Sequence, residues 1–299
     1  MNRLLSIGVL GLALVLSGCA QRGPVPVTGQ AFALFGDVPY SRAEVNHLDG
    51  MIDAMNREPL AFVVHVGDIT SGGGPCTDGW LEARREQFAR LRAPFVLLPG
   101  DNDWTDCHRT GFDPMERLRK WRSLFCREPA ALRFDRFERQ PGEYCEHIRW
   151  THEGVLFVAL NIQGSNNNLG RTPEMDREYA TRMRAVQAWI DASAQEVHKG
   201  RARALVLLMQ ADPFFERGDQ EDPKDGLAIL RRELTALAAS LGNRLAVVHG
   251  DTHAFRNDRP RAGLQRVEVP GSPLLRWLRS ALSVKDSASQ DFLTVEIVN

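Results

Sequence analysis

Four aspartates occupy equivalent positions in the chain, each after a short apolar stretch and a single glycine: Asp37, Asp68, Asp101 and Asp251. Such apolar stretches are typical of buried strands, whose carboxyl ends line the ligand crevice of an open α/β sheet. The glycine before each aspartate allows a sharp turn and a close approach of the backbone to a ligand. Four carboxylates on one rim, with His253 nearby, would repel one another unless a cation lay among them. The pattern favours a metal site over four unrelated turns.

The elements that would position these residues follow from the hydrophobic pattern and the helix caps. Buried strands are predicted at residues 31–35, 61–66, 94–98, 155–161, 204–209 and 244–249, and two more, at a sheet edge or in a second sheet, at 265–269 and 292–298. Helices are predicted from the capping box at Ser41 to about Asn56, from Asp113-Pro114, from Thr172-Pro173 to near Gly200, and from near Lys224 to Gly242. This alternation predicts one α/β domain with parallel strands inside.

Most of the chain carries an ordered set of short motifs: Gly36-Asp37-Val38-Pro39, Gly67-Asp68-Ile69-Thr70-Ser71, Gly100-Asp101-Asn102-Asp103, Met209-Gln210-Ala211-Asp212-Pro213 and Gly250-Asp251-Thr252-His253. Their order and spacing resemble the calcineurin-like metallophosphoesterases, which carry Asp-x-His, Gly-Asp-x-x-Asp, Gly-Asn-His-Asp/Glu, a lone histidine after a strand, and Gly-His-x-His. Residues 100–109 also look like a signature of an uncharacterised bacterial and fungal branch of that superfamily. The resemblance implies a four-layer αββα sandwich, two sheets flanked by helices, over residues 31–299.

The resemblance also implies two sets of metal ligands. Asp37, Asp68 and His253 would hold the first cation, although Pro39 replaces the family's histidine and cannot ligate. The second cation would be held by Asp68, Asp101, Gln210 and Asp251. Because oxygen atoms have replaced most of the family's imidazoles, the site should prefer Mn²⁺, Mg²⁺ or Ca²⁺ over Zn²⁺.

The activity implied by the resemblance is divalent-cation-dependent hydrolysis of phosphomonoesters or phosphodiesters, with Asp68 bridging the two cations. Asn102 stands where the family has its acid-donating histidine, and an amide cannot donate that proton. His108 and Arg109, in the next turn of the same loop, are candidates for the general acid and the phosphate clamp. The alternative is a non-catalytic protein that keeps the fold and one structural cation.

Charge and motif content argue against other ligands. The formal net charge of −1 and the pI of about 6.7 give no electrostatic basis for binding nucleic acid. The chain has no Walker-type or Gly-x-Gly-x-x-Gly sequence for a nucleotide. A phosphoester is therefore the expected substrate.

The first residues predict export. Arg3 precedes an apolar stretch over residues 4–16, a layout typical of a secretory signal and too short for a membrane span. The stretch ends in Leu16-Ser17-Gly18-Cys19, which resembles the bacterial lipobox, in which the cysteine is lipid-modified. An ordinary cleaved signal peptide is the alternative.

The lipobox resemblance implies a signal peptide over residues 1–18 and a linker over 19–30. Ala20 directly after the lipidated cysteine favours sorting to the outer membrane. The expected location is the bacterial cell envelope, with the protein facing the periplasm and held to the membrane by its N-terminal lipid.

Four cysteines remain after Cys19, and an even number in an oxidising compartment predicts two disulfides with three possible pairings. We favour Cys76–Cys107 with Cys126–Cys145. The first pair lies in two loops that each follow a Gly-Asp strand end, and so on one rim. Zinc is the competing interpretation, but the chain has no Cys-x-x-Cys spacing to support it.

The lipid anchor gives a first testable prediction. Replacing Cys19 with serine removes the only thiol that the lipobox offers for acylation, so Cys19→Ser should move the protein from the membrane to the soluble periplasmic fraction. Fractionation followed by immunoblotting measures this. A variant that stays in the membrane fraction would rule the lipoprotein hypothesis out.

Overall fold

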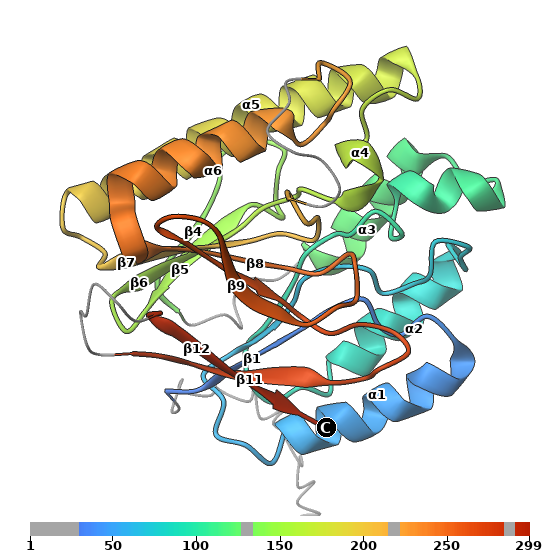
Figure 1. The fold of residues 1–299 in the computed structure, drawn as a ribbon. Coiled ribbons are helices and arrows are strands. Elements are labelled where there is room, and N and C mark those ends of the chain that lie inside the picture. The colour runs from blue at the N-terminus through green and yellow to red at the C-terminus, as the bar shows by residue number, and fades with distance from the viewer. Residues whose placement is uncertain (1–29, 127–133, 215–221, 284–290) are drawn as a thin grey trace, which may run out of the picture.

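Two β-sheets lie face to face at the centre of the structure, and helices cover the outer face of each sheet (Figure 1). Apolar side chains from both sheets form the core between them, among them Phe32 and Val64 from one sheet and Phe157 and Val206 from the other. A second core joins α5 (Pro173–His198) and α6 (Ala228–Leu241) to the larger sheet, and a third joins α1 (Arg42–Met55) and α2 (Asp78–Phe88) to the smaller one. This is the expected four-layer αββα arrangement.

The computed structural model describes residues 30–126, 134–214, 222–283 and 291–299. The predicted signal peptide over residues 1–18, the lipidated Cys19 and all but the last residue of the linker over 19–30 lie outside these ranges. None of the helices in the described ranges is long and apolar enough to cross a membrane.

The smaller sheet has the strand order β12-β11-β1-β2-β3. Its strands are β1 (Phe32–Phe35), β2 (Val63–His65), β3 (Phe95–Leu97), β11 (Trp277–Leu282) and β12 (Leu293–Val298). Strands β1, β2 and β3 run parallel, so the loops that carry the first three Gly-Asp pairs leave the sheet at the same edge.

The larger sheet has the order β4-β5-β6-β7-β8-β10-β9. Its strands are β4 (Asp135–Arg139), β5 (Ile148–His152), β6 (Val155–Ala159), β7 (Ala204–Leu208), β8 (Leu245–His249), β9 (Arg256–Arg261) and β10 (Leu264–Glu268). Strands β6, β7, β8 and β10 are parallel neighbours, which places the loops after β6, β7 and β8 together.

Helix caps begin most helices where the sequence predicts. Ser41, Asp113 and Thr172 accept hydrogen bonds from the first turns of α1, α3 (Pro114–Phe125) and α5. The capping box at Ser41 is altered, because the Glu44 carboxylate accepts the backbone N–H of Tyr40 at 2.7 Å. Three short helical segments complete the chain: the 3₁₀ helices η1 (Thr105–Thr110) and η2 (Gly242–Arg244), and α4 (Gly164–Asn167).

Some elements differ from the sequence-based prediction. Strands β4, β5, β9 and β11 and helix α2 were not predicted. Their charged residues interrupt the hydrophobic period by which strands and helices are recognised in a sequence. The last long helix begins at Ala228 rather than near Lys224, because residues 222–227 form turns in which Asp222 and Asp225 accept backbone N–H groups. The remaining predicted strands are confirmed, within one or two residues at most ends.

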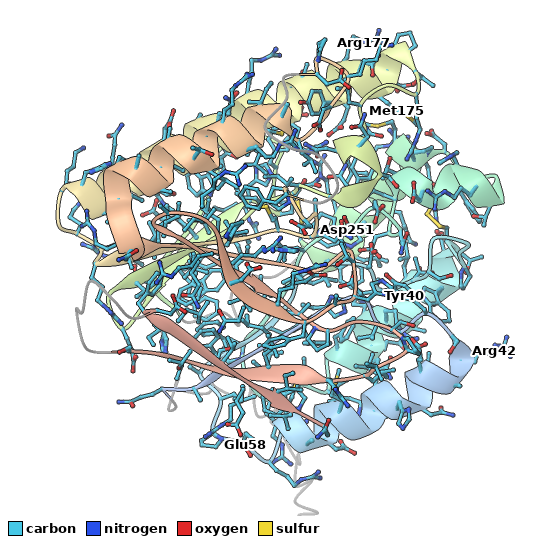
Figure 2. All side chains as sticks on the ribbon, viewed as in Figure 1. Tyr40, Arg42, Glu58, Met175, Arg177 and Asp251 are labelled. Atoms are coloured by element: carbon cyan, nitrogen blue, oxygen red, sulfur yellow. A yellow bond between two sulfur atoms is a disulfide. The ribbon has the colours of Figure 1, made fainter. Side chains whose placement is uncertain are left out.

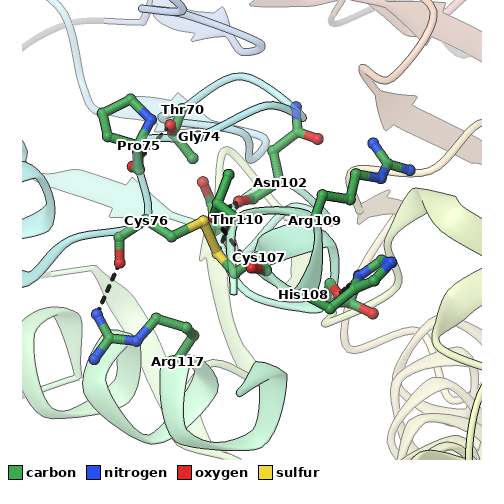
Figure 3. The surroundings of a disulfide bond; sticks show 12 residues. Thr70, Gly74, Pro75, Cys76, Asn102, Cys107, His108, Arg109, Thr110 and Arg117 are labelled. Atoms are coloured by element: carbon green, nitrogen blue, oxygen red, sulfur yellow. Dashed lines mark hydrogen bonds between the residues drawn. A yellow bond between two sulfur atoms is a disulfide. The ribbon is translucent and has the colours of Figure 1, made fainter. Parts of the chain in front are cut away.

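Both favoured disulfides are present, Cys76–Cys107 and Cys126–Cys145. The first joins the loop after β2 to η1 in the loop after β3, and both sulfur atoms lie near the backbone oxygen of Asn102 (Figure 3). It therefore ties together two of the loops that carry the Gly-Asp pairs.

Removing the first disulfide should lower stability without changing the fold. For the pair Cys76→Ala with Cys107→Ala, loss of a cross-link spanning 31 residues should reduce the free energy of unfolding by about 3–4 kcal/mol. Urea denaturation of the oxidised wild type and the double variant measures the difference. Coincident denaturation curves would contradict a stabilising role.

Candidate metal centre

The four predicted aspartates converge at the carboxyl ends of parallel strands from both sheets. The Asp251 N–H donates to Asp37 Oδ1 at 3.1 Å, which links the loop after β8 to the loop after β1. The Asn102 N–H donates to Asp68 Oδ1 at 3.0 Å, which links the loops after β3 and β2. Gln210, after β7, donates its Nε2 to Asp68 Oδ2 at 3.2 Å and to Asp251 Oδ1 at 3.1 Å. Predicted ligands from five loops thus form one cluster.

Glycines make this convergence possible in a way that the sequence did not reveal. A Cβ on Gly100 would collide with the carboxylate of Asp68, and a Cβ on Gly250 with that of Asp37. Each of these glycines therefore makes room for an aspartate from another loop. Gly164, which sequence reasoning missed, does the same, since its Cβ would lie 2.5 Å from Asp251 Oδ1 and 2.8 Å from Asp101 Oδ2.

The backbone of the site is strained. Asp37, Asp68, Asp251 and His253 all have left-handed conformations, with φ of 54°, 64°, 78° and 63°. For residues other than glycine this conformation costs about 1–2 kcal/mol each, and it is concentrated at functional sites. The strain redirects each side chain into the cluster as the chain leaves its strand.

Asp103 is a buried organiser that sequence reasoning did not single out. Its carboxylate accepts the N–H groups of Asp68 at 3.1 Å, Ile69 at 2.7 Å and Gly100 at 2.8 Å. These bonds lock the turn after β2 against the turn after β3. The signal was its position as the last residue of Gly100-Asp101-Asn102-Asp103.

Neutral donors surround the central carboxylate. Asp68 Oδ2 accepts hydrogen bonds from Asn102 Nδ2 at 2.8 Å, Tyr40 OH at 3.0 Å and Gln210 Nε2 at 3.2 Å. The orientation of Gln210 is fixed because the N–H of Gly164 donates to its Oε1 at 2.6 Å. Gln210 therefore turns N–H groups, and not its oxygen, toward the carboxylates.

Asp37, Asp68 and Asp101 are buried and Asp251 is partly buried, so each carboxylate is poorly solvated and close to other negative charges. Burial and then the charge of Asp251 raise the pKa of Asp37, and burial and then the charge of Asp101 raise that of Asp68. Burial, with Asp251 next in effect, raises the pKa of Asp101 to about 7, and burial raises the pKa of Asp251 to about 6. Within the described residues, no lysine or arginine forms an ion pair with any of the four.

These features fit bound divalent cations. Asp37 Oδ2 is buried without a hydrogen-bond partner and would join Asp68 and His253 in a first ligand set. A second set would comprise carboxylate oxygens of Asp68, Asp101 and Asp251. The donors are mostly carboxylate oxygens, the ligands that Mg²⁺, Ca²⁺ and Mn²⁺ prefer.

A second buried cluster lies next to this site but has its own charge compensation. Side-chain atoms of Asp212, His249 and Glu268 lie within 4.8 Å of one another. Arg266 Nη1 lies 3.2 Å from Asp212 Oδ2, and Arg256 pairs with Glu268. Glu268 also accepts the N–H of Ala254 at 3.2 Å, so this cluster anchors the loop that carries Asp251 and His253.

The two candidates in the loop after β3 differ in placement (Figure 3). Arg109 is about half exposed, and its guanidinium lies 2.8 Å from Asp106 Oδ2 and 3.4 Å from the carbonyl oxygen of Gly72. Ser165 Oγ lies 2.7 Å from Asp106 Oδ2 and 2.7 Å from Asp101 Oδ2, which links Arg109 to the cluster.

His108 lies apart from the carboxylates. It is exposed, and its Nδ1 lies 2.9 Å from the carbonyl oxygen of Thr105 in its own 3₁₀ helix. In the described part of the chain it makes no hydrogen bond to the predicted ligands. The structure thus brings Arg109 to the rim of the site and leaves His108 outside the cluster.

Known proteins resemble this chain in structure and not in sequence. No protein-family model and no curated protein matches it. A dimetal phosphatase from Danio rerio superposes with a TM-score of 0.58 at 15% identity, over 87% of this chain and 94% of that one. A purple acid phosphatase from yellow lupin superposes with a TM-score of 0.51 at 13% identity, over 92% of this chain and 52% of the lupin chain, so this chain spans about half of that protein. The chain has the calcineurin-like metallophosphoesterase fold.

The raised pKa of Asp101 predicts how the stability of the cation-free protein changes with pH. Asp101 has a folded-state pKa of about 7 and an ordinary value of 3.8, so the cation-free folded chain holds a proton that the unfolded chain has lost. The stability that this proton contributes is fully present below the unfolded-state pKa of 3.8, and it is lost as the pH rises through the folded-state pKa of about 7. An asparagine at this position stays neutral at every pH, so Asp101→Asn should raise the free energy of unfolding at about pH 8 more than at about pH 5.

The measurement is chemical denaturation in the presence of a chelator. Asp53→Asn is the matched control, because Asp53 is exposed and pairs with Arg90 at 2.9 Å. A surface change of this kind should alter stability by less than about 0.5 kcal/mol at either pH. An Asp101→Asn variant that is less stable than the wild type at both pH values would show that repulsion does not dominate the cluster.

Proposed function

We propose that this chain, which has the metallophosphoesterase fold, is a divalent-cation-dependent hydrolase of phosphomonoesters or phosphodiesters. The observation that carries the proposal is the convergence of four carboxylates, those of Asp37, Asp68 and Asp101 buried and that of Asp251 partly buried, without a paired basic side chain in the described residues. Among them, Asp37 Oδ2 is buried without a hydrogen-bond partner. Burying this much negative charge is costly unless cations bind among the carboxylates. Bound cations would polarise the phosphoryl group and supply a hydroxide nucleophile.

The residues at the rim can orient a phosphoester. The half-exposed Arg109 guanidinium presents N–H groups at the rim, where they could donate to phosphoryl oxygens, whereas Asn102 Nδ2 donates to Tyr40 and Asp68 within the cluster. Neither Asn102 nor Arg109 can give up a proton to the departing oxygen at neutral pH. Because His108 lies outside the cluster, esters with good leaving groups, such as aryl phosphates, are the favoured substrates.

A second candidate function is supported by Gln210. Its Nε2 group donates to both Asp68 and Asp251, the place where the second cation would lie. An amide held in this way can compensate part of the negative charge without a metal. The candidate is a non-catalytic protein with one structural cation at Asp37, Asp68 and His253.

The cellular setting is also a proposal. A lipid on Cys19 would hold the folded domain at a bacterial membrane, facing the periplasm, and Ala20 directly after the lipidated cysteine favours sorting to the outer membrane. The two disulfides support an oxidising compartment.

The deciding variant is Asp68→Asn, since Asp68 contacts groups of both ligand sets. In the wild type, added Mn²⁺ should raise the melting temperature by mass action, and the protein should hydrolyse aryl phosphate monoesters or diesters. In Asp68→Asn the affinity for Mn²⁺ and the rate of hydrolysis should each fall by more than about 100-fold. That is the upper end of the loss seen when a residue that only supports a metal ligand is changed.

The outcomes separate the two candidates. Stabilisation by Mn²⁺ with hydrolysis, both lost in Asp68→Asn, supports the enzyme. Stabilisation without hydrolysis of any ester supports the non-catalytic protein. In that case Gln210→His, which restores an imidazole at the second cation position, should increase the number of bound cations. A wild type that neither binds a cation nor hydrolyses an ester would refute both.

A further inference from the structure

Pro39 leaves a gap among the ligands of the first cation, and the next side chain reaches into that gap. Tyr40, labelled in Figure 2, places its hydroxyl oxygen 3.0 Å from Asp68 Oδ2 and 3.1 Å from His253 Nε2. Asn102 Nδ2 lies 3.1 Å from the same oxygen. The tyrosine oxygen therefore lies between the carboxylate and the imidazole that would hold this cation.

A closed set of hydrogen bonds fixes the orientation of both rings. The Tyr40 N–H donates to Glu44 Oε2 at 2.7 Å, and the Ser272 hydroxyl donates to Glu44 Oε1 at 2.8 Å. His253 Nδ1 lies 2.8 Å from the carbonyl oxygen of Ser272. A carbonyl oxygen can only accept, so Nδ1 carries the proton and Nε2 turns its lone pair toward Tyr40. The two rings meet edge to face, with centroids 5.1 Å apart.

Without a cation, the single proton of one hydroxyl serves two of the predicted ligands. The Tyr40 hydroxyl has a single proton and two acceptors within reach, Asp68 Oδ2 and His253 Nε2, while Asn102 donates to its oxygen. Asp68 Oδ2 has two further donors, Asn102 Nδ2 and Gln210 Nε2. When the hydroxyl donates to the carboxylate, the lone pair of His253 Nε2 is therefore left without a donor among the described residues. Ligand atoms at about 2.1 Å from a cation, with right angles between them, lie about 3 Å apart. This matches the 3.0 and 3.1 Å that separate the Tyr40 oxygen from Asp68 Oδ2 and from His253 Nε2.

We propose that the Tyr40 oxygen is a ligand of the first cation, in the position that Pro39 cannot fill. This inference rests on the proposed function. With Asp37, Asp68 and His253 it gives three oxygen ligands and one imidazole, a set that favours Mn²⁺ over Zn²⁺. It also explains why Glu44 caps the backbone of Tyr40 and not that of Ser41, since the bond holds the tyrosine over the site.

The test is Mn²⁺ binding to the full chain, measured by isothermal titration calorimetry for the wild type and Tyr40→Phe. The phenylalanine keeps the ring and removes only the oxygen. We expect Tyr40→Phe to lower the Mn²⁺ affinity by at least about tenfold. Tyr144→Phe is the matched control, because Tyr144 stacks on His147 and should leave the affinity unchanged.

A second measurement reports on the tyrosine itself. The chain has only three tyrosines, so a near-ultraviolet difference spectrum on adding Mn²⁺ should show a tyrosine signal in the wild type and in Tyr144→Phe. The signal should be absent in Tyr40→Phe. A tyrosine that served only as a hydrogen-bond donor would lower the melting temperature of the chelated protein when removed, and would leave the affinity for Mn²⁺ intact.

If Tyr40→Phe does not fold, the difference spectrum of the wild type decides, because it needs no change at Tyr40. Equal Mn²⁺ affinity in the wild type and Tyr40→Phe, or no tyrosine signal in the wild type on adding Mn²⁺, would overturn the inference and leave the proposed function standing. A wild type that binds no cation would overturn the proposed function itself.

Discussion

The repulsion among four carboxylates, three of them buried, is the constraint on which the site depends. Asp37, Asp68, Asp101 and Asp251 come from four strand ends in two different sheets. Burial raises the pKa of each, and the charge of another aspartate of the cluster raises it further for Asp37, Asp68 and Asp101. Such a cluster would push the loops apart unless other interactions held them. Much of the surrounding structure holds these loops together against the repulsion.

Three kinds of interaction oppose the repulsion. Buried acceptors in the framework, Asp103 and Glu268, tie the backbone of the site loops by accepting their N–H groups. The Cys76–Cys107 disulfide joins two of the same loops covalently. Neutral donors then satisfy the oxygens of Asp68 directly. These interactions hold the carboxylates close together, and a preformed anionic site of this kind can bind a cation without much rearrangement.

The changes from the family motifs have a common physical effect. A tyrosine oxygen lies beside the gap left by Pro39, an asparagine amide replaces a proton donor, and a glutamine amide replaces an imidazole. Each change exchanges a group that can ligate through nitrogen or carry a proton for a neutral oxygen or amide group. The site consequently presents neutral hydrogen-bond donors to Asp68 where the motifs that this chain resembles have imidazoles.

The sequence alone predicted the parallel strands and the aspartates at the strand ends, because hydrophobic period, caps and Gly-Asp spacing are local signals. The four layers followed only from the resemblance to the metallophosphoesterases, and the disulfide pairing was a preference among three possible pairings. It did not reveal the roles of Tyr40 and Gly164 or the orientation of the Gln210 amide, because each depends on a residue from a distant loop. These residues are His253 for Tyr40, Asp251 for Gly164, and Gly164 for Gln210. The roles of Asp103 and Glu268 were hidden for the same reason. A side chain's direction and its hydrogen-bond partners are set only when the two sheets pack together, and that packing decided which oxygens and protons meet in the site.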